Sequence, residues 1–295
     1  MLRGRQERGR LTSLLAVLTM MLWPGWAWAV QTVTLQLRWT PQFQFAGYYV
    51  ALERGYYRDA GLDVLIRPAA PGTPAPIEAV TSGHADFGTA NSGLASARMN
   101  SQPVTAVAAV LQHSASVWLV RSQTDQPPDV HDLHDLAQRR LSAIAGPGES
   151  VELLAPFLAQ GIGADQLHLV PTNYGLEPLL DGTVDAISAS LANEPFELRR
   201  RGIDFAVVEP SHFGIDFYGE VLFTSDAFAH DHPDAVKRMR AASLRGWAAA
   251  FADIEGTARM IHQRYAPGRS VEQLRHEGEV LRQLAEPNKA DLGQM

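Results

Sequence analysis

Short apolar runs alternate with helical patterns along most of the chain. Runs typical of strands lie at 33–37, 62–66, 86–90, 104–111, 117–120, 140–145, 167–170, 186–189 and 205–208. Between them, the spacing predicts helices at 46–60, 76–82, 92–99, 129–137, 150–160 and 176–181. This βαβα order predicts an α/β fold with mostly parallel sheets.

The pattern becomes helical after residue 224. Three helices are predicted at roughly 233–252, 254–265 and 271–284, which form a C-terminal helical region. We expect two lobes with a ligand cleft between them, lobe 1 from 31–119 and 222–295 and lobe 2 from 120–221. The stretch 123–128, which contains two consecutive prolines, is the most linker-like and lies where the chain would leave lobe 1.

Residues 1–29 have the pattern of a secretory signal peptide. Four arginines precede an apolar run at 11–22, and Ala27-Trp28-Ala29 is typical of a cleavage site, so the mature chain would begin at Val30. The alternative is an uncleaved anchor, but the apolar stretch reaches only the lower limit for a span and contains Pro24 and Gly25. We therefore expect export to a bacterial periplasm.

Composition excludes several classes of protein. The 295 residues carry a formal net charge of −7, which argues against a nucleic-acid binder. The absence of cysteine excludes disulfides, thiolate metal sites, a thiol nucleophile and a lipid anchor on an N-terminal cysteine. The chain has no G-x-S-x-G, H-E-x-x-H or GxxxxGK[ST] sequence. We interpret the close histidine pairs His131/His134 and His230/His232 as surface residues and expect no metal site.

Several segments carry a resemblance to a known family. They are WTPQFQFAGYYVA at 39–51, ERGYY at 53–57, AGLDV at 60–64, GHADFG at 83–88, GPGES at 146–150, NEP at 193–195 and GIDFYGE at 214–220. As a set they resemble the NMT1/THI5-like family of periplasmic binding-protein-like domains associated with thiamine pyrimidines. The resemblance covers 31–295 and implies a two-lobed type II periplasmic binding protein fold that clamps its ligand between the lobes.

The ligand that this resemblance implies is a thiamine-precursor-like aminopyrimidine. Such a ligand requires an aromatic wall, a carboxylate for the amino group and ring nitrogen, and amides for the remaining edge. Trp39 follows the first strand and is the best candidate for the wall, with a core tryptophan as the alternative. Of the adjacent Tyr48 and Tyr49, one is expected in the core and the other, Tyr49, in the cleft.

Polar candidates follow the predicted strands. Asn91 and Ser92 lie at the start of a predicted helix. They either cap this helix or also present polar groups to the ligand. The family equivalent of Glu194 sits in the pyrimidine pocket, although Asn193 stands where relatives often have an aromatic residue. The full set of expected ligand-binding residues is Trp39, Tyr49, Asn91, Ser92, Gly148, Glu149, Ser150, Asn173, Tyr174, Glu194, Asp216 and Tyr218.

The weaker candidates in this set have structural alternatives. The turn at 148–150 offers free N–H groups to a polar oxygen, or its glutamate only complements the helix dipole. The pair at 173–174 follows a strand and offers a second aromatic ring. Asp216 and Tyr218 lie at the return crossover, where they either contact the ligand or serve the hinge.

An enzyme of pyrimidine synthesis is the disfavoured alternative. Eukaryotic members of the family use pyridoxal phosphate, which needs a Schiff-base lysine, and no lysine lies between Val30 and Lys237. We expect a monomeric binding protein without a cofactor, whose partner is an ABC permease or a fused signalling module. A sulfonate, nitrate or other small solute is the alternative ligand; an anion would need an arginine such as Arg38 or Arg121, and Glu194 argues against it.

Overall fold

A computed structural model describes residues 30–122, 130, 132–143, 150–170, 175–286 and 292–295. The predicted signal peptide, the stretch 123–128 and four expected site residues, Gly148, Glu149, Asn173 and Tyr174, lie outside the described residues. Within the described ranges, no helix combines the length and apolar character that crossing a bilayer requires.

The first five-stranded sheet has the order β2-β1-β3-β10-β4. Its strands are β1 (Gln31–Gln36), β2 (Leu62–Arg67), β3 (Phe87–Ala90), β4 (Val104–Leu111) and β10 (Glu220–Ser225). The strand β1 is parallel to β2 and β3, whereas β10 runs antiparallel between β3 and β4. We call lobe 1 the segments that build this sheet, 31–111 and 220–295.

The second five-stranded sheet has the order β7-β6-β8-β5-β9. Its strands are β5 (Ser116–Arg121), β6 (Arg140–Ser142), β7 (His168–Leu169), β8 (Ala186–Ser190) and β9 (Phe205–Val208). Here β5 is the antiparallel strand, and it pairs with β8 and β9. We call lobe 2 the segment 116–208. Each sheet thus has parallel strands and one antiparallel strand, which agrees with the predicted α/β fold.

The crossings between the sheets differ from the expected boundaries. The chain leaves lobe 1 between Leu111 and Ser116, because β4 belongs to the first sheet and all of β5 to the second. It returns before Glu220, the first residue of β10. The predicted boundaries after 119 and 221 therefore cut through two strands, and the proline pair at 127–128 comes after the crossing.

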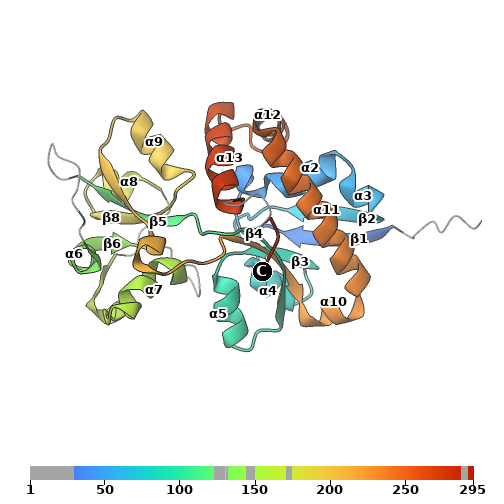
Figure 1. Cartoon of the computed structure of the whole chain (residues 1–295), viewed down its shortest axis with the longest axis horizontal. Helices are drawn as coiled ribbons and strands as arrows, with labels where there is room; N and C mark the ends of the chain where they lie inside the picture. The colour runs from blue at the N-terminus through green and yellow to red at the C-terminus, as the bar shows by residue number, and fades with distance from the viewer. Residues whose placement is uncertain (1–29, 123–129, 131, 144–149, 171–174, 287–291) are drawn as a thin grey trace, which may run out of the picture. The chain divides into compact units, whose positions relative to one another are not determined.

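Helices cover both sheets (Figure 1). In lobe 1 they are η1 (Phe43–Phe45), α2 (Ala46–Glu53), α3 (Tyr56–Asp59), α4 (Pro76–Thr81), α5 (Gly93–Met99), α10 (Asp226–Asp231), α11 (Pro233–Ala252), α12 (Ile254–Arg264) and α13 (Val271–Ala285). In lobe 2 they are α6 (Leu133–Ala137), α7 (Val151–Ala159), η2 (Ala164–Gln166), α8 (Glu177–Leu180) and α9 (Glu194–Arg200), with η3 (Pro210–Phe213) in the return linker.

The helix predicted at 46–60 is interrupted. Gly55 has φ +74°, a left-handed conformation that ends α2 and starts α3. The short helices α9 and α10 are absent from the prediction, because each spans only six or seven residues and carries little apolar periodicity.

The core of lobe 1 is aromatic and includes the C-terminal helices. Phe43 stacks on Phe251 of α11 at 6.4 Å between ring centroids, and Tyr48 meets Trp247 edge-on at 5.7 Å. The predicted helical region is therefore part of lobe 1. Lobe 2 has its own core, in which Trp118 packs against other buried apolar residues.

Candidate functional site

The carboxyl ends of β1 and β3 bring polar residues together at one edge of the first sheet. Arg38 follows β1 and Asn91 follows β3. Glu220 begins the antiparallel β10, so its position falls at the same edge. Ligands of open α/β sheets bind at this edge because the loops that follow parallel strands meet there.

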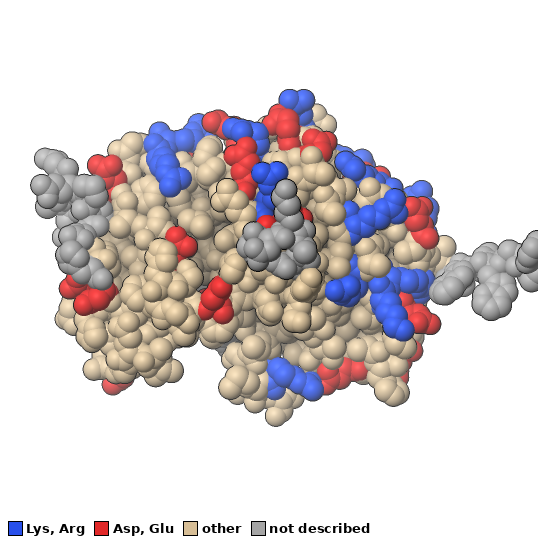
Figure 2. Space-filling model, in the orientation of Figure 1, with Lys and Arg blue, Asp and Glu red and all other residues tan. Residues whose placement is uncertain are grey.

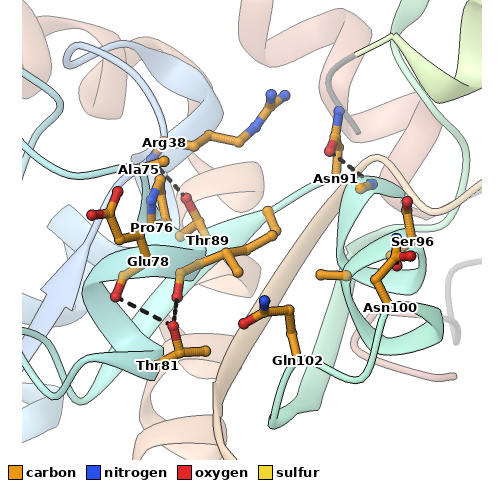
Figure 3. Close-up of a pocket in the computed structure, with 14 residues that line it drawn as sticks. Arg38, Ala75, Pro76, Glu78, Thr81, Thr89, Asn91, Ser96, Asn100 and Gln102 are labelled. Atoms are coloured by element: carbon orange, nitrogen blue, oxygen red, sulfur yellow. Dashed lines mark hydrogen bonds between the residues drawn. The ribbon is translucent and has the colours of Figure 1, made fainter. Parts of the chain in front are cut away.

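A cavity of about 460 Å³ opens at this edge between α4 and α5 (Figure 3). Its floor includes Thr89 and Ala90 of β3. Figure 3 shows Arg38 and Asn91 at one end of the cavity and Thr81 and Gln102 at the other. The volume suits a small organic ligand. The lining residues are Arg38, Ala75, Pro76, Ile77, Glu78, Thr81, Thr89, Ala90, Asn91, Gly93, Ser96, Ala97, Asn100 and Gln102.

The cavity offers side-chain amides and hydroxyls, the Glu78 carboxylate and the Arg38 guanidinium. The side-chain oxygen of Asn91 accepts a hydrogen bond from the Gly93 amide at 3.0 Å, which fixes the turn between β3 and α5. None of the described residues that line the cavity is aromatic. The expected aromatic wall is therefore not part of this cavity, although Trp39 adjoins Arg38 in the chain.

Glu220 is a fully buried carboxylate next to the cavity. Its Oε2 atom accepts a hydrogen bond from Gln44 Nε2 at 2.9 Å and faces Arg38 Nε at 3.5 Å. Its Oε1 atom is buried without a hydrogen-bond partner among the described residues. Burial raises the pKa of Glu220 to about 7, although the nearby Arg38, Gln44 and Thr89 favour the ionised form.

A chain of side-chain amides leads from Glu220 to lobe 2. Gln42 Nε2 donates to Gln44 Oε1 at 2.9 Å, and Asn193 Nδ2 donates to Gln42 Oε1 at 3.4 Å. Asn193 precedes α9 in lobe 2, so this chain joins the two lobes. The Oδ1 atom of Asn193 is also buried without a partner among the described residues.

Glu152 of α7 forms a second polar contact between the lobes. It is almost completely buried, and its Oε1 accepts hydrogen bonds from the Ser92 amide at 3.1 Å and the Ser92 hydroxyl at 2.7 Å. Its Oε2 accepts from the hydroxyl of Ser114, which lies in the linker between β4 and β5. A carboxylate of lobe 2 is therefore held by lobe 1 and by the linker.

The third contact surrounds Arg269 and Glu277. Glu277 accepts a hydrogen bond from Arg269 at 2.6 Å and one from the Phe43 amide at 2.8 Å. Burial, with a smaller effect from the nearby carboxylate of Glu194, raises the pKa of Glu277 to about 7, although Arg269 and the Phe43 amide favour the ionised form. Burial also raises the pKa of Glu194, while the Ser190 amide, which donates to it at 2.7 Å, and Arg269 lower it.

An aromatic contact between the lobes accompanies this cluster. Phe196 of α9 stacks on His276 of α13 with 4.9 Å between the ring centroids. Burial lowers the pKa of His276, and the positive charge of Arg199 lowers it further. The ring of His276 is therefore neutral at pH 7 and packs as an apolar group.

The linkers enclose a smaller cavity of about 300 Å³. It is lined by residues of both linkers and lobe 2 together with Leu284 of α13. His113 Nδ1 and Asp216 Oδ2 lie 2.6 Å apart at this place, one in each linker. Asp216 thus joins the two linkers to each other.

The structure separates the expected site residues. Asn91 lines the larger cavity, Ser92 binds Glu152, and Glu194 lies at the junction of the lobes. Trp39 is partly buried against the core of lobe 1, Ser150 starts α7, and Tyr218 is exposed in the return linker.

Tyr49 lies in the core rather than in a cleft. Its side chain is 2 % exposed and stacks on Tyr265 at 4.0 Å between ring centroids. The adjacent Tyr48 is also fully buried, so both tyrosines belong to the core of lobe 1. The amphipathic pattern cannot separate them, because α2 is apolar on all sides and is covered by α11 and α12.

The structure adds four functional candidates that the sequence did not indicate, namely Gln42, Gln44, Glu152 and Glu220. The FYGE end of the 214–220 segment contains Glu220, which was the available signal.

The two arginines considered as anion-binding residues have different surroundings. Arg38 lines the larger cavity, whereas Arg121 donates to the Leu179 and Leu180 carbonyl oxygens of α8. Among the described residues, no group of three or more His, Cys, Asp or Glu is arranged to hold a metal ion.

Two α/β lobes joined by two linkers, with polar residues of both lobes meeting at the carboxyl edge of a sheet, define the class of type II periplasmic binding protein folds. The periplasmic aliphatic sulphonate binding protein SsuA from Escherichia coli shares this fold, with a TM-score of 0.64 over 84% of this chain and 83% of that chain at 15% identity. The model of the NMT1/THI5 like family matches residues 42–256, and the chain belongs to this family.

Two relatives resemble this chain in sequence. The formylaminopyrimidine-binding protein of Halalkalibacterium halodurans is 27% identical over 229 residues, which is 74% of this chain and 66% of that protein. The riboflavin-binding protein RibY of Chloroflexus aurantiacus is 26% identical over 236 residues, 76% of this chain and 64% of that protein. The chain thus spans just under two thirds of each relative's length.

Proposed function

We propose that this chain is a periplasmic solute-binding protein that clamps a thiamine-precursor-like aminopyrimidine between its lobes. The observation that carries the proposal is the cavity of about 460 Å³ at the carboxyl edge of the first sheet. Its rim residue Arg38 adjoins Glu220, from which the amide chain runs to lobe 2. A ligand at this edge touches lobe 1 directly and favours the arrangement in which lobe 2 closes over it.

The chemistry of the edge suits a flat nitrogen heterocycle. Buried carboxylates at Glu194 and Glu220 can accept from an amino group, and the Asn91 amide can serve another ring edge. The formylaminopyrimidine-binding and riboflavin-binding relatives both carry flat nitrogen heterocycles in their names. We propose Trp39, Asn91, Ser92 and Glu194 as ligand-site residues and assign Asp216 and Tyr218 to the hinge.

A small anion such as a sulfonate is the second candidate ligand. The observation that favours it is Arg38, whose side chain is 26% exposed and lines the cavity. The carboxylate of Glu220 offsets this charge, since it lies 3.5 Å from the guanidinium. The face shown in Figure 2 has acidic and basic residues interspersed over lobe 1, with no continuous basic stripe among its described residues.

We also propose that the chain binds its ligand and does not transform it. Pyridoxal-phosphate chemistry requires a lysine, and the sequence has none between residues 30 and 236. We propose that the closed form is recognised by an ABC permease or by a membrane signalling module. We propose that residues 1–29 direct export of the chain to the periplasm. There we expect it to act as a monomer.

Thermal unfolding with a ligand panel tests the proposal. The panel is hydroxymethylpyrimidine, its formylamino analogue, riboflavin, taurine and nitrate. A ligand at 100 times its Kd should add about 2.7 kcal/mol to the free energy of unfolding. We expect a shift with the pyrimidines that is lost in Glu194→Gln and kept in Glu197→Gln, a control on the same helix whose carboxylate pairs with Arg201. A shift with taurine or nitrate alone would contradict the ligand and favour the second candidate.

A further inference from the structure

The polar chain between the lobes is short of hydrogen-bond donors. It runs from Glu220 through Gln44 and Gln42 to Asn193, and each amide nitrogen in it donates to the next oxygen. Within this polar chain, two buried side-chain atoms have no hydrogen-bond partner among the described residues, and both are oxygens: Glu220 Oε1 at one end and Asn193 Oδ1 at the other. A buried acceptor without a donor is unfavourable, so native structures rarely keep one unless a ligand or water supplies the missing group.

These two acceptors belong to different lobes. Glu220 starts β10 of lobe 1, beside the cavity residues Arg38 and Thr89. Asn193 belongs to lobe 2. A ligand that donates hydrogen bonds to both would hold the lobes together, whereas an anion could satisfy neither.

We propose that Glu220 determines the specificity of the cleft by accepting a hydrogen bond at Oε1 from an N–H group of the bound heterocycle. The inference rests on the proposed function and assigns the selection of an amino group to a residue other than Glu194. Glu220 also pairs with Arg38, so it weakens the attraction of the cavity for anions.

The substitution Glu220→Gln replaces the acceptor Oε1 by a hydrogen-bond donor. Gln44 Nε2 and Arg38 Nε both point at Oε2 of Glu220, and the Thr89 side chain also favours the ionised carboxylate. In Glu220→Gln the amide oxygen must therefore stay with these donors, which places the NH2 group where Oε1 now lies. The variant then offers a donor to the ligand in place of an acceptor.

The test is a pair of ligands with opposite character at one ring position. Isothermal titration at about pH 8.5, where Glu220 with its pKa of about 7 is ionised and Oε1 is an acceptor, compares two compounds. They are 4-amino-5-hydroxymethyl-2-methylpyrimidine and its 4-oxo counterpart, which has an acceptor in place of the amino group. The wild type should bind the amino compound at least about tenfold more tightly, because the wrong partner leaves a buried polar group unpaired. Glu220→Gln should lose this preference or reverse it.

Glu277→Gln is the matched control. Glu277 is also buried with a pKa raised to about 7, but both of its oxygens have partners, Arg269 and the Phe43 amide. This variant should keep the preference of the wild type for the amino compound.

The outcomes separate the two proposals. A wild type that binds the amino compound, with the same preference in Glu220→Gln, would overturn the role of Glu220 and leave the proposed function standing. A wild type that prefers the 4-oxo compound overturns the inference even if the variant fails to fold. A wild type that binds neither pyrimidine overturns both.

Discussion

Burial controls the ionisation of two glutamates in lobe 1. Glu220 and Glu277 are each at most 1% exposed, and burial raises the pKa of both to about 7. Both lie within reach of an arginine, Arg38 or Arg269, whose charge only partly offsets the loss of hydration. Such carboxylates are costly to the fold when ionised, and they persist at positions where a ligand or a neighbouring lobe needs an acceptor.

These raised pKa values predict an unusual pH dependence of stability. Between about pH 4.5 and pH 7 the folded protein holds protons on Glu220 and Glu277 that the unfolded chain has released. Their contribution to the free energy of unfolding therefore falls as the pH rises through this window. A shift from 4.5 to about 7 corresponds to roughly 3 kcal/mol for Glu220 at pH 8.

Denaturant unfolding of the unliganded protein from pH 5 to pH 8 measures this effect. Glu220→Gln should reduce the fall in the free energy of unfolding between pH 5 and pH 8. Glu277→Gln should also reduce this fall, independently of Glu220→Gln. If neither substitution changes the slope, the two carboxyl groups are not the source of the pH dependence.

At the scale of elements, one helix crossing joins the N-terminal and C-terminal parts of lobe 1. The helices α2 and α11 meet at two glycines, where a Cβ atom added to Gly246 would lie 2.1 Å from the carbonyl oxygen of Gly47. A Cβ on Gly47 would meet the ring of Trp247 at the same distance. Only glycine allows the backbones to come this close, and Trp247 then packs over α2.

Gly246→Ala should destabilise the protein by about 1–3 kcal/mol, because the added methyl group pushes the two helices apart. The higher helix propensity of alanine offsets only about 1 kcal/mol of this cost. Gly268→Ala is the control, since nothing lies within 4 Å of a Cβ at that position. Chemical denaturation should show a lower midpoint for Gly246→Ala alone, and equal midpoints would contradict the close crossing.

At the scale of the whole molecule, the lobes are held together by contacts on either side of the proposed cleft. Glu152 of lobe 2 binds Ser92 of lobe 1, while Phe196 of lobe 2 stacks on His276 of lobe 1. These contacts must break when the lobes separate. The free energy that a ligand needs to close the protein is therefore set partly by them.

Glu152→Gln should shift the unliganded protein toward an open form. The glutamine oxygen can still accept from Ser92, but the NH2 group that replaces Oε2 cannot accept from the Ser114 hydroxyl as the carboxylate does. Small-angle scattering should show a larger radius of gyration for the unliganded variant than for the wild type, and saturating ligand should reverse the difference. Glu255→Gln, whose carboxylate pairs with Arg259 and Arg275 within lobe 1, is the control. An unchanged radius in Glu152→Gln would contradict the role of this contact.

The sequence by itself determined most of the alternation of strands and helices, the α/β class and the two-lobed organisation, but it did not indicate β10, α9 or α10. The features that it determined depend on local patterns, since a strand or helix is recognised from the spacing of its own apolar residues. The family resemblance at 39–51 and 214–220 is likewise local in sequence. The exact crossing points were missed because β5 and the strands of lobe 1 have the same apolar character, and only pairing assigns β5 to the second sheet.

Only the tertiary structure decided which polar residues meet. Arg38 and Glu220 are 182 positions apart, Gln42 and Asn193 are 151 apart, and Ser92 and Glu152 are 60 apart. Glu220 appears in the sequence as one charged residue before an apolar strand, and its buried, half-partnered carboxylate results from where β10 enters the sheet. The periodicity of a chain specifies faces and lengths, whereas a binding site depends on distances between segments that only packing brings together.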